Sequence, residues 1–347
     1  MSDTAESSWA ASLDPVAAAR WAQLAQALPQ IPWLHEEVGL RLLERIDWVQ
    51  LPPVATWCNW HQAQGGSALH HTLATRWPQA PCYAPTLGNH APKITPNLGA
   101  IQAAFTAKNS ENTQKNTPKH NASNANNAAR HKSLEALHKG KNWLQHLLGG
   151  KAPAAQAAPT PLAVAPAPRS VQLLVANMLL HSSPNPGVLL QSWQQSLATG
   201  GVLFFSCLGP DTLRPLQRIY QRLGWPSPIQ RLVDMHDLGD ALVNTGLATP
   251  VMEMEQLTLT YSSPAALLQE LRTLGRNLHP GRFPALRGRA WRAQLMAELE
   301  GLRAADGRIH LPIEIIYGHA FQTEPKQSAS GESIVSLEQL RRNLPQP

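Results

Sequence analysis

The sequence predicts an α/β protein built on a doubly wound, mostly parallel sheet. Continuous apolar runs such as "LLVA" and "VLFFSC" indicate strands buried on both faces, as parallel sheets require. Segments with helical periodicity separate these runs, and alternation of strand and helix is typical of a parallel sheet. The alternating stretch "VMEMEQLTLTY" indicates a half-exposed strand. We expect it to pair with "IEIIYGHAF" as an antiparallel edge of the sheet.

The first hundred residues read as helices followed by a strand, helix and strand. Residues 13–49 are expected to be helical, because Val38, Leu42 and Ile46 recur at helical spacing. "LPPVATWC" resembles a short strand, "SALHHTLATRWP" a helix ended by Pro78, and "APCYAPTLG" a second strand. This order is the unit from which a parallel sheet is built.

Composition changes sharply after Ala103. Residues 103–170 are rich in Asn, Lys, Ala and Pro, and their first part has too few apolar side chains to offset the entropy of ordering. We expect a low-complexity insertion that splits one domain: its Asn-rich part is expected to be disordered, and a short helix at "LEALHKGKNWLQHLLGG" and an extended linker are expected to follow. The predicted organisation is N-terminal helices over 1–50, domain halves over 51–102 and 171–322, and a mobile tail over 323–347.

The second half continues the alternation. "PGVLLQSWQQSLATGG" is expected to be a helix ending at Gly200–Gly201, where a left-handed residue costs least. "DTLRPLQRIYQRLG" and "DMHDLGDALVNTGL" are expected to be helical, with Asp237 as the N-cap of the latter. Residues 264–302 are expected to form a helical cap.

Composition and cysteine usage limit the class of protein. The chain has 347 residues and a net charge of +6, and no apolar run reaches the ~18 to 20 residues that span a bilayer. No export signal is visible at the N-terminus. Cys58, Cys82 and Cys207 are widely spaced and odd in number, which favours reduced thiols and a cytoplasmic location. Cys58 with nearby histidines lacks a second ligand pair, so no metal site is expected.

Four blocks carry a resemblance to a known family. They are "LATGGVLFFSCLGPDTLRPL", "DMHDLGDALVNTGLATPVM", "LTLTYSSPAALLQELRTLG" and "IEIIYGHAF". This pattern resembles the malonyl-[acyl-carrier protein] O-methyltransferases of biotin synthesis, which have the Rossmann-like class I methyltransferase fold. The resemblance is close over residues 171–322 and loose over 13–100. It implies methyl transfer from S-adenosylmethionine to the free carboxylate of malonyl-acyl carrier protein.

The cofactor half departs from the family pattern. The resemblance implies an acid and a bare glycine turn after the first strand, where this chain has Thr56, Cys58 and Trp60. Gly65–Gly66 come several residues late. Three further positions where the family has acids are neutral here: Thr86 after the second strand, the Ala158–Pro159 stretch, and Gln172. Two interpretations stay open: an unusual working pocket, or a non-catalytic relative that acts as a binding or regulatory protein.

Other site residues are expected near the acceptor. Asn177 ends a strand at the carboxyl edge, where it either lies beside the cofactor or caps a loop. By resemblance, Tyr317 is expected to bind substrate, and Arg272 could pair with the malonyl carboxylate through a bidentate bond. His236 is a further substrate-binding candidate, although an ionised acceptor needs no base.

A basic segment over 272–292 contains no acid. Its arginines are Arg272, Arg276, Arg282, Arg287, Arg289 and Arg292. Such a local field attracts an acidic partner, so we expect the last five to dock acyl carrier protein. A solvated basic helix without a partner is the alternative. The absence of a recognised binding module and the small number of interleaved aromatics disfavour nucleic acid.

Overall fold

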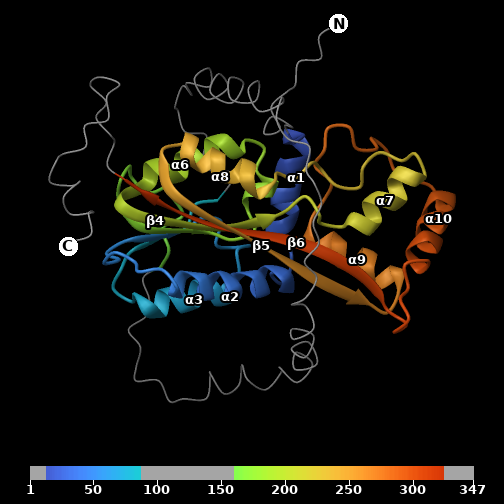
Figure 1. Ribbon diagram of the computed structural model, residues 1–347, viewed down its shortest axis with the longest axis horizontal. Helices are drawn as coiled ribbons and strands as arrows, with labels where there is room; N and C mark the ends of the chain where they lie inside the picture. The colour runs from blue at the N-terminus through green and yellow to red at the C-terminus, as the bar shows by residue number, and fades with distance from the viewer. Residues whose placement is uncertain (1–12, 87–159, 324–347) are drawn as a thin grey trace, which may run out of the picture.

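The computed structural model describes residues 13–86 and 160–323, and Figure 1 shows one sheet covered by helices. The strand order is β2-β1-β3-β4-β6-β5. The strands are β1 (Trp57–Asn59), β2 (Cys82–Tyr83), β3 (Val171–Ala176), β4 (Leu197–Leu208), β5 (Leu247–Tyr261) and β6 (Ile309–Gln322). Strands β2, β1, β3 and β4 pair in parallel, whereas β6 runs antiparallel to both β4 and β5. The predicted fold class and the antiparallel pairing are confirmed, with β6 one place inside the edge strand β5.

Helices cover both faces of the sheet. In Figure 1, α2 (Trp33–Asp47) and α3 (Ser67–Arg76) lie on one face, and α6 (Pro186–Ser196) and α8 (Met235–Asn244) on the other. Each face has its own apolar core. Val38 and Leu42 of α2 are fully buried on the first, and Leu190 and Trp193 of α6 on the second. The apolar residues predicted to face the sheet therefore do so.

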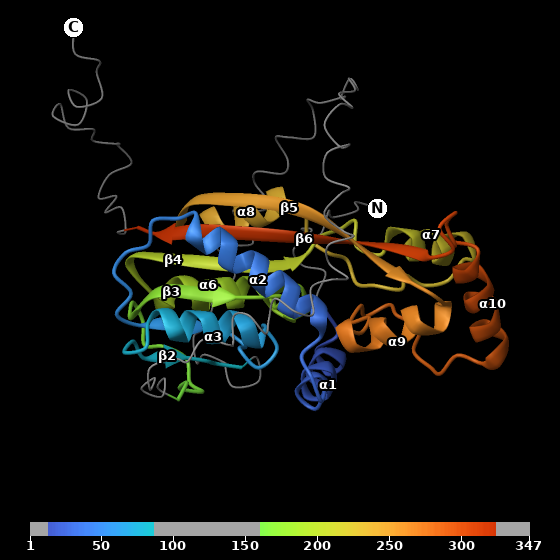
Figure 2. The same cartoon turned by 90° about the horizontal axis from the view of Figure 1, so that it is seen from below.

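Three helices form a cap beside the far ends of β5 and β6 (Figures 1 and 2). They are α7 (Arg214–Arg222), α9 (Pro264–Leu274) and α10 (Arg289–Glu300). Residues 264–302 form the predicted cap, but they are not helical throughout, because residues 275–288 lie outside helices. Pro280 and Pro284 lack the amide hydrogens that a helix needs, which accounts for the break. Helix α1 (Pro15–Gln26) and the 3₁₀ turn η5 (Leu180–Ser182) complete the described elements.

Three boundaries differ from the prediction. The first strand begins at Trp57, not at Leu51, because Pro52 and Pro53 cannot donate ladder hydrogen bonds. Helix α6 ends at Ser196, and the Gly200–Gly201 pair lies within β4, where Gly200 has φ +78°.

The N-cap of α8 is Asp234 instead of Asp237. The Asp234 carboxylate accepts a hydrogen bond from the His236 amide at 2.8 Å. Asp237 lies in the first turn, where an acid also suits the helix dipole.

Parts of the prediction concern residues outside the described ranges. These are most of the expected insertion, up to residue 159, and the expected tail from residue 324. Ala158 and Pro159 lie there too. Within 13–86 and 160–323, no helix is both long and apolar enough to cross a membrane.

Candidate functional site

The chain reverses its winding between β1 and β3. These neighbouring parallel strands are followed by crossovers in opposite directions, to β2 and to β4. In open α/β sheets ligands bind at such a switch point, beside the carboxyl ends of the strands. The segments that meet there are residues 60–66 after β1 and residues 177–182 after β3.

The Asn177 side chain forms a clamp at this edge of the sheet, that is, a set of hydrogen bonds that joins three segments. Its side-chain amide donates to the His35 carbonyl at 2.8 Å and to the Gly65 carbonyl at 2.7 Å. Its carbonyl oxygen accepts from the Ser206 hydroxyl at 2.6 Å. The side chain is buried, and both of its amide hydrogens are engaged. Asn177 therefore ties α2, the β1 turn and β4 together, although its predicted role beside the cofactor stays a prediction.

The N-terminus of α3 carries a carboxylate from α2. Glu36 accepts hydrogen bonds from the Ser67 amide at 2.8 Å, the Ser67 hydroxyl at 2.6 Å and the Ala68 amide at 3.1 Å. Gly66 has φ +100°, and a Cβ there would lie 3.2 Å from the His35 carbonyl oxygen. The late glycine pair thus supplies the turn into α3. A helix N-terminus is a natural anion site, and here Glu36 occupies it.

Two of the predicted cofactor positions lie at the opposite end of the sheet. The Thr56 amide donates to the Gln172 side chain at 2.8 Å, and the Gln172 amide donates to the Thr56 carbonyl at 3.0 Å. Both residues belong to the amino ends of their strands. The assignment of Thr56 to the cofactor turn is corrected, because the strand starts later than predicted. Asn59, Trp60 and His61 stand at the carboxyl end instead.

The bulky side chains of the β1 segment do not fill the crevice. Trp60 is 1% exposed and packs edge-on against Trp193 of α6, with ring centroids 6.4 Å apart. Cys58 lies in the same cluster, and burial raises the pKa of its thiol well above the usual value. Trp57 faces the other core and lies 5.2 Å from the His70 ring. The Trp60 indole therefore lies in the core on the α6 side and not in the crevice.

Three imidazoles line a small cavity at the switch point. The cavity measures about 20 Å³ and is bordered by His35, His61 and His181, together with Gln64 and Met178. Burial, and then the neighbouring His35, lower the pKa of His61 to about 4 and that of His181 to about 3. Burial also lowers the pKa of His35. All three imidazoles are therefore neutral at pH 7.

The described residues do not form the usual site for S-adenosylmethionine, the cofactor that the resemblance implies. No carboxylate borders the small cavity, and Thr86 follows β2 where the family has an acid for the ribose. A volume of about 20 Å³ is too small for a nucleoside and suits only a small polar group. We therefore assign no reaction step to the cofactor.

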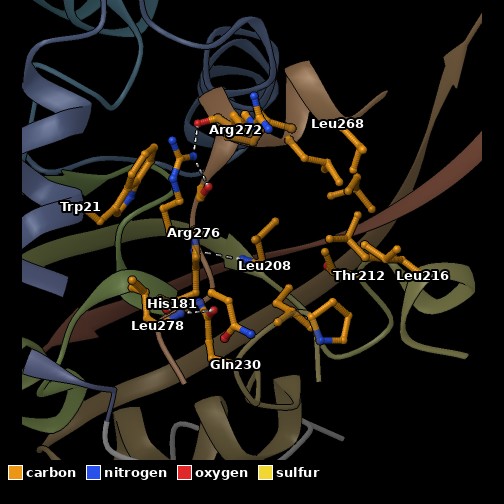
Figure 3. A pocket seen from close by; sticks show the side chains of 18 of the residues that line it. Trp21, His181, Leu208, Thr212, Leu216, Gln230, Leu268, Arg272, Arg276 and Leu278 are labelled. Atoms are coloured by element: carbon orange, nitrogen blue, oxygen red, sulfur yellow. Dashed lines mark hydrogen bonds between the residues drawn. The ribbon is translucent and has the colours of Figure 1, made fainter. Parts of the chain in front are cut away.

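A much larger apolar chamber adjoins the small cavity. It measures about 440 Å³ and lies between the carboxyl ends of β3 and β4 and the helical cap. Six of its leucines are Leu208, Leu213, Leu216, Leu268, Leu271 and Leu295. The two cavities share His35, Met178 and His181 as lining residues. Figure 3 shows Leu208 and Leu216 in the wall, with Arg272, Arg276 and Trp21 grouped on another side.

The three residues predicted to bind substrate lie in different parts of the structure. Arg272 borders the chamber and is exposed. Tyr317 lies in the core on the α2 side, where the Arg45 guanidinium sits 3.7 Å above its ring. The His236 side chain is 77% exposed on α8 and pairs with Asp234. Neither Tyr317 nor His236 is among the residues that line the chamber.

The basic segment is also divided. Arg282 pairs with Asp14 at 2.7 Å, and Arg287 lies 4.0 Å from the Phe283 ring and 4.8 Å from the Trp291 ring. Arg276 lies 5.1 Å from the Trp21 ring and donates to the Arg272 and Gly275 carbonyls. Arg289 and Arg292, at the start of α10, are exposed. They are the arginines best placed for the predicted docking role.

The "GPDTL" block has a structural explanation. The Glu314 carbonyl on β6 accepts from the Gly209 amide at 2.9 Å and from the Thr212 hydroxyl at 3.1 Å. Its carboxylate accepts from the Asp211 amide at 2.5 Å. Burial raises the pKa of Glu314. These bonds fix the segment that leads from β4 into α7, and thus one wall of the chamber.

Sequence reasoning missed the histidines of the small cavity. They come from three segments far apart in the chain: α2, the turn after β1 and η5. The available signal was position, since His61 and His181 follow strands at the carboxyl edge. Among the described residues, no group of three or more His, Cys, Asp or Glu side chains is placed to hold a metal ion.

Curated relatives of this chain are methyltransferases. The malonyl-[acyl-carrier protein] O-methyltransferase of Gallionella capsiferriformans is 36% identical over 198 residues, which is 56% of this chain and 67% of that protein. The enzyme of the same name from Nitrosospira multiformis is 39% identical over 158 residues, 45% of this chain and 51% of the relative. The Laribacter hongkongensis enzyme of that name is 36% identical over 155 residues, which is 44% of this chain and 52% of that protein. The matches thus span about half to two thirds of the relatives, and none favours a non-catalytic protein.

Solved structures give weaker similarity. The YcgJ protein of Bacillus subtilis has a TM-score of 0.40 at 10% identity and covers 82% of this chain and 98% of its own. Phosphoethanolamine N-methyltransferase 2 of Haemonchus contortus, in complex with S-adenosyl-L-methionine, has a TM-score of 0.37 at 12% identity. The match covers 82% of this chain and 52% of that protein. No family model matches the chain. On the relationship to the Gallionella enzyme, the chain belongs to the malonyl-[acyl-carrier protein] O-methyltransferase family.

Proposed function

We propose that this protein is an S-adenosylmethionine-dependent methyltransferase whose acceptor is the free carboxylate of malonyl-acyl carrier protein. The observation that carries the proposal is the 440 Å³ apolar chamber at the carboxyl ends of β3 and β4. Its volume lies within the range of small-molecule sites, and its lining residues are mainly apolar, with leucine the most frequent. The family relationship supports a malonyl thioester as the occupant.

The chain's own residues perform binding and orientation. The leucine wall excludes water from the acyl chain, which strengthens polar contacts made inside the chamber. Arg272 and Arg276 border the chamber with exposed side chains. They are suited to the phosphate of a carrier's prosthetic arm, because guanidinium groups bind phosphate through paired hydrogen bonds.

Acyl carrier protein is the proposed partner. Arg289 and Arg292 lie on the cap helix α10, next to the chamber that the arm would enter. An exposed basic surface there attracts an acidic carrier and raises its association rate. Reduced cysteines Cys58, Cys82 and Cys207 support the further proposal of a cytoplasmic location.

One structural observation favours a second candidate. The residues that line the small cavity offer no carboxylate for a ribose and only about 20 Å³ of space, so binding of the carrier without methyl transfer is the alternative. The relatives do not favour it, since those compared are named as methyltransferases.

A single assay separates the two candidates. Purified protein is incubated with malonyl-acyl carrier protein and methyl-labelled S-adenosylmethionine, and carrier binding is followed in parallel. The proposal predicts a labelled methyl ester that base hydrolysis releases as methanol. Carrier binding without ester formation would replace it with the binding role. If the protein neither binds malonyl-acyl carrier protein nor forms the ester, both candidate functions are wrong.

A further inference from the structure

The small cavity that adjoins the chamber is lined by polar atoms that the fold leaves without partners. His35 Nε2, His61 Nδ1 and Gln64 Nε2 are buried and make no hydrogen bond. His35 is 6% exposed and His61 is 5% exposed. A buried unsatisfied polar group costs about 1 to 3 kcal/mol, so three around one cavity indicate a ligand that satisfies them.

Backbone contacts define what the imidazole atoms can do. His35 Nδ1 lies 2.8 Å from the Gln64 carbonyl oxygen, which only accepts, so Nδ1 carries the proton. His35 Nε2 then presents a lone pair to the cavity. His181 Nδ1 accepts from the Leu208 amide at 3.3 Å, so its proton is on Nε2. The cavity therefore combines one acceptor with N–H donors from His181 and Gln64.

Two residues beside the cavity have left-handed backbones. His61 has φ 62° and Met178 has φ 54°. Such conformations are uncommon for residues other than glycine, and they cluster at ligand sites. The His61 amide donates to the Pro85 carbonyl at 2.7 Å, which holds the turn in this form.

We propose that His35, His61, His181 and Gln64 form a binding site for the carboxylate of a ligand that enters through the chamber. His181 and Gln64 donate to the carboxylate oxygens, and His35 Nε2 takes up a proton and becomes a third donor. Because a carboxylate offers about four acceptor lone pairs, one lone pair then remains free for reaction. The inference rests on the proposed function, which supplies a malonyl carboxylate at the end of an acyl chain.

The arrangement of charge favours this assignment over Arg272. Arg272 and Arg276 are exposed, whereas the histidines are shared between the chamber and the smaller cavity. An arm that enters past the arginines therefore brings its phosphate to them and its terminal carboxylate to the histidines.

Proton uptake is the distinguishing property of this site. The ionisable groups around His35 are Glu36 on its own helix, His61 after β1, His181 on η5, and Arg272 and Arg276 from the α9 end. Burial lowers the pKa of His35 in the free protein, and a bound carboxylate raises it again. Between those two values, binding takes up a proton. Affinity therefore rises as pH falls through the bound-state pKa and levels off below the free-state pKa.

Titration calorimetry tests the proposal on the intact chain. The probes are malonyl-pantetheine, its methyl ester and S-adenosylhomocysteine, each at pH 8 in two buffers of different ionisation enthalpy. We expect malonyl-pantetheine to bind with net proton uptake and its ester to bind at least tenfold more weakly without uptake. Uptake with S-adenosylhomocysteine alone would retain the carboxylate site but assign it to the amino-acid part of the cofactor.

Variants locate the proton. His35→Phe should abolish uptake, and Gln64→Met, a milder change, should weaken binding several-fold while uptake persists. His71→Gln, on the exposed face of α3, is the matched control and should change neither. The proposal would be overturned if malonyl-pantetheine and S-adenosylhomocysteine both bind without proton uptake. Equal affinity for malonyl-pantetheine and its methyl ester would also overturn it. Proton uptake in a protein that forms no methyl ester would preserve this site while the proposed function fails.

Discussion

Replacing Asn177 with alanine should destabilise the fold substantially. The side chain makes three buried hydrogen bonds, to the His35 carbonyl, the Gly65 carbonyl and the Ser206 hydroxyl. At about 1 kcal/mol for each bond, and with a small cavity added, the loss is about 3 kcal/mol. That is a large fraction of the stability of a typical domain.

Urea unfolding followed by tryptophan fluorescence measures this loss. The midpoint should fall in Asn177→Ala at an unchanged slope, while the control Asn244→Ala, on the exposed end of α8, should stay within about 0.5 kcal/mol of wild type. Ser206→Ala should couple to Asn177→Ala by about 1 kcal/mol, because the two share a hydrogen bond. A loss below 0.5 kcal/mol together with weaker binding of S-adenosylhomocysteine would refute the clamp and support the sequence-based cofactor role.

Three further predictions concern the chamber and its surroundings. Leu271→Trp should fill part of the chamber and lower methyl transfer at least tenfold without loss of stability, whereas unchanged transfer would place the acyl chain elsewhere. The double change Arg289→Glu and Arg292→Glu should weaken carrier binding at low salt, and Arg169→Glu, at another exposed arginine, is the control. If the control weakens carrier binding as much as the double change does, α10 is not the docking surface. Because burial raises the folded-state pKa of Glu314, its contribution to stability is present below the unfolded pKa and lost as pH rises through the folded value. Glu314→Gln should therefore flatten the pH dependence of urea unfolding above the ordinary glutamate pKa of about 4.3, and an identical profile would contradict this prediction.

The fold could be predicted because its signals are local. The buried runs of β3 and β4 and the alternation of β5 follow from side-chain periods within a few residues. Prolines account for the errors in the predicted ends of helices and strands. Pro52 and Pro53 delay β1, and Pro280 and Pro284 divide the cap into two helices.

The site was predicted less well because it depends on segments that only folding brings together. The late start of β1 moves Thr56 to the amino end of the sheet, and it brings His61 to the carboxyl end. His35 reaches the same place only because α2 packs beside the β1 turn, where Asn177 bonds its carbonyl. Trp60 could not be placed from sequence, since one step along a strand reverses the face to which a side chain points.

The most direct test of the account is the position of the malonyl group in the bound state. Malonyl-pantetheine labelled with ¹³C in its methylene group can be bound to the protein and its nuclear Overhauser contacts recorded. The account predicts contacts with the methyl groups of Met178 and Leu271, which line the chamber on opposite elements. Contacts confined to residues outside the chamber, such as those around Tyr317 or His236, would contradict it.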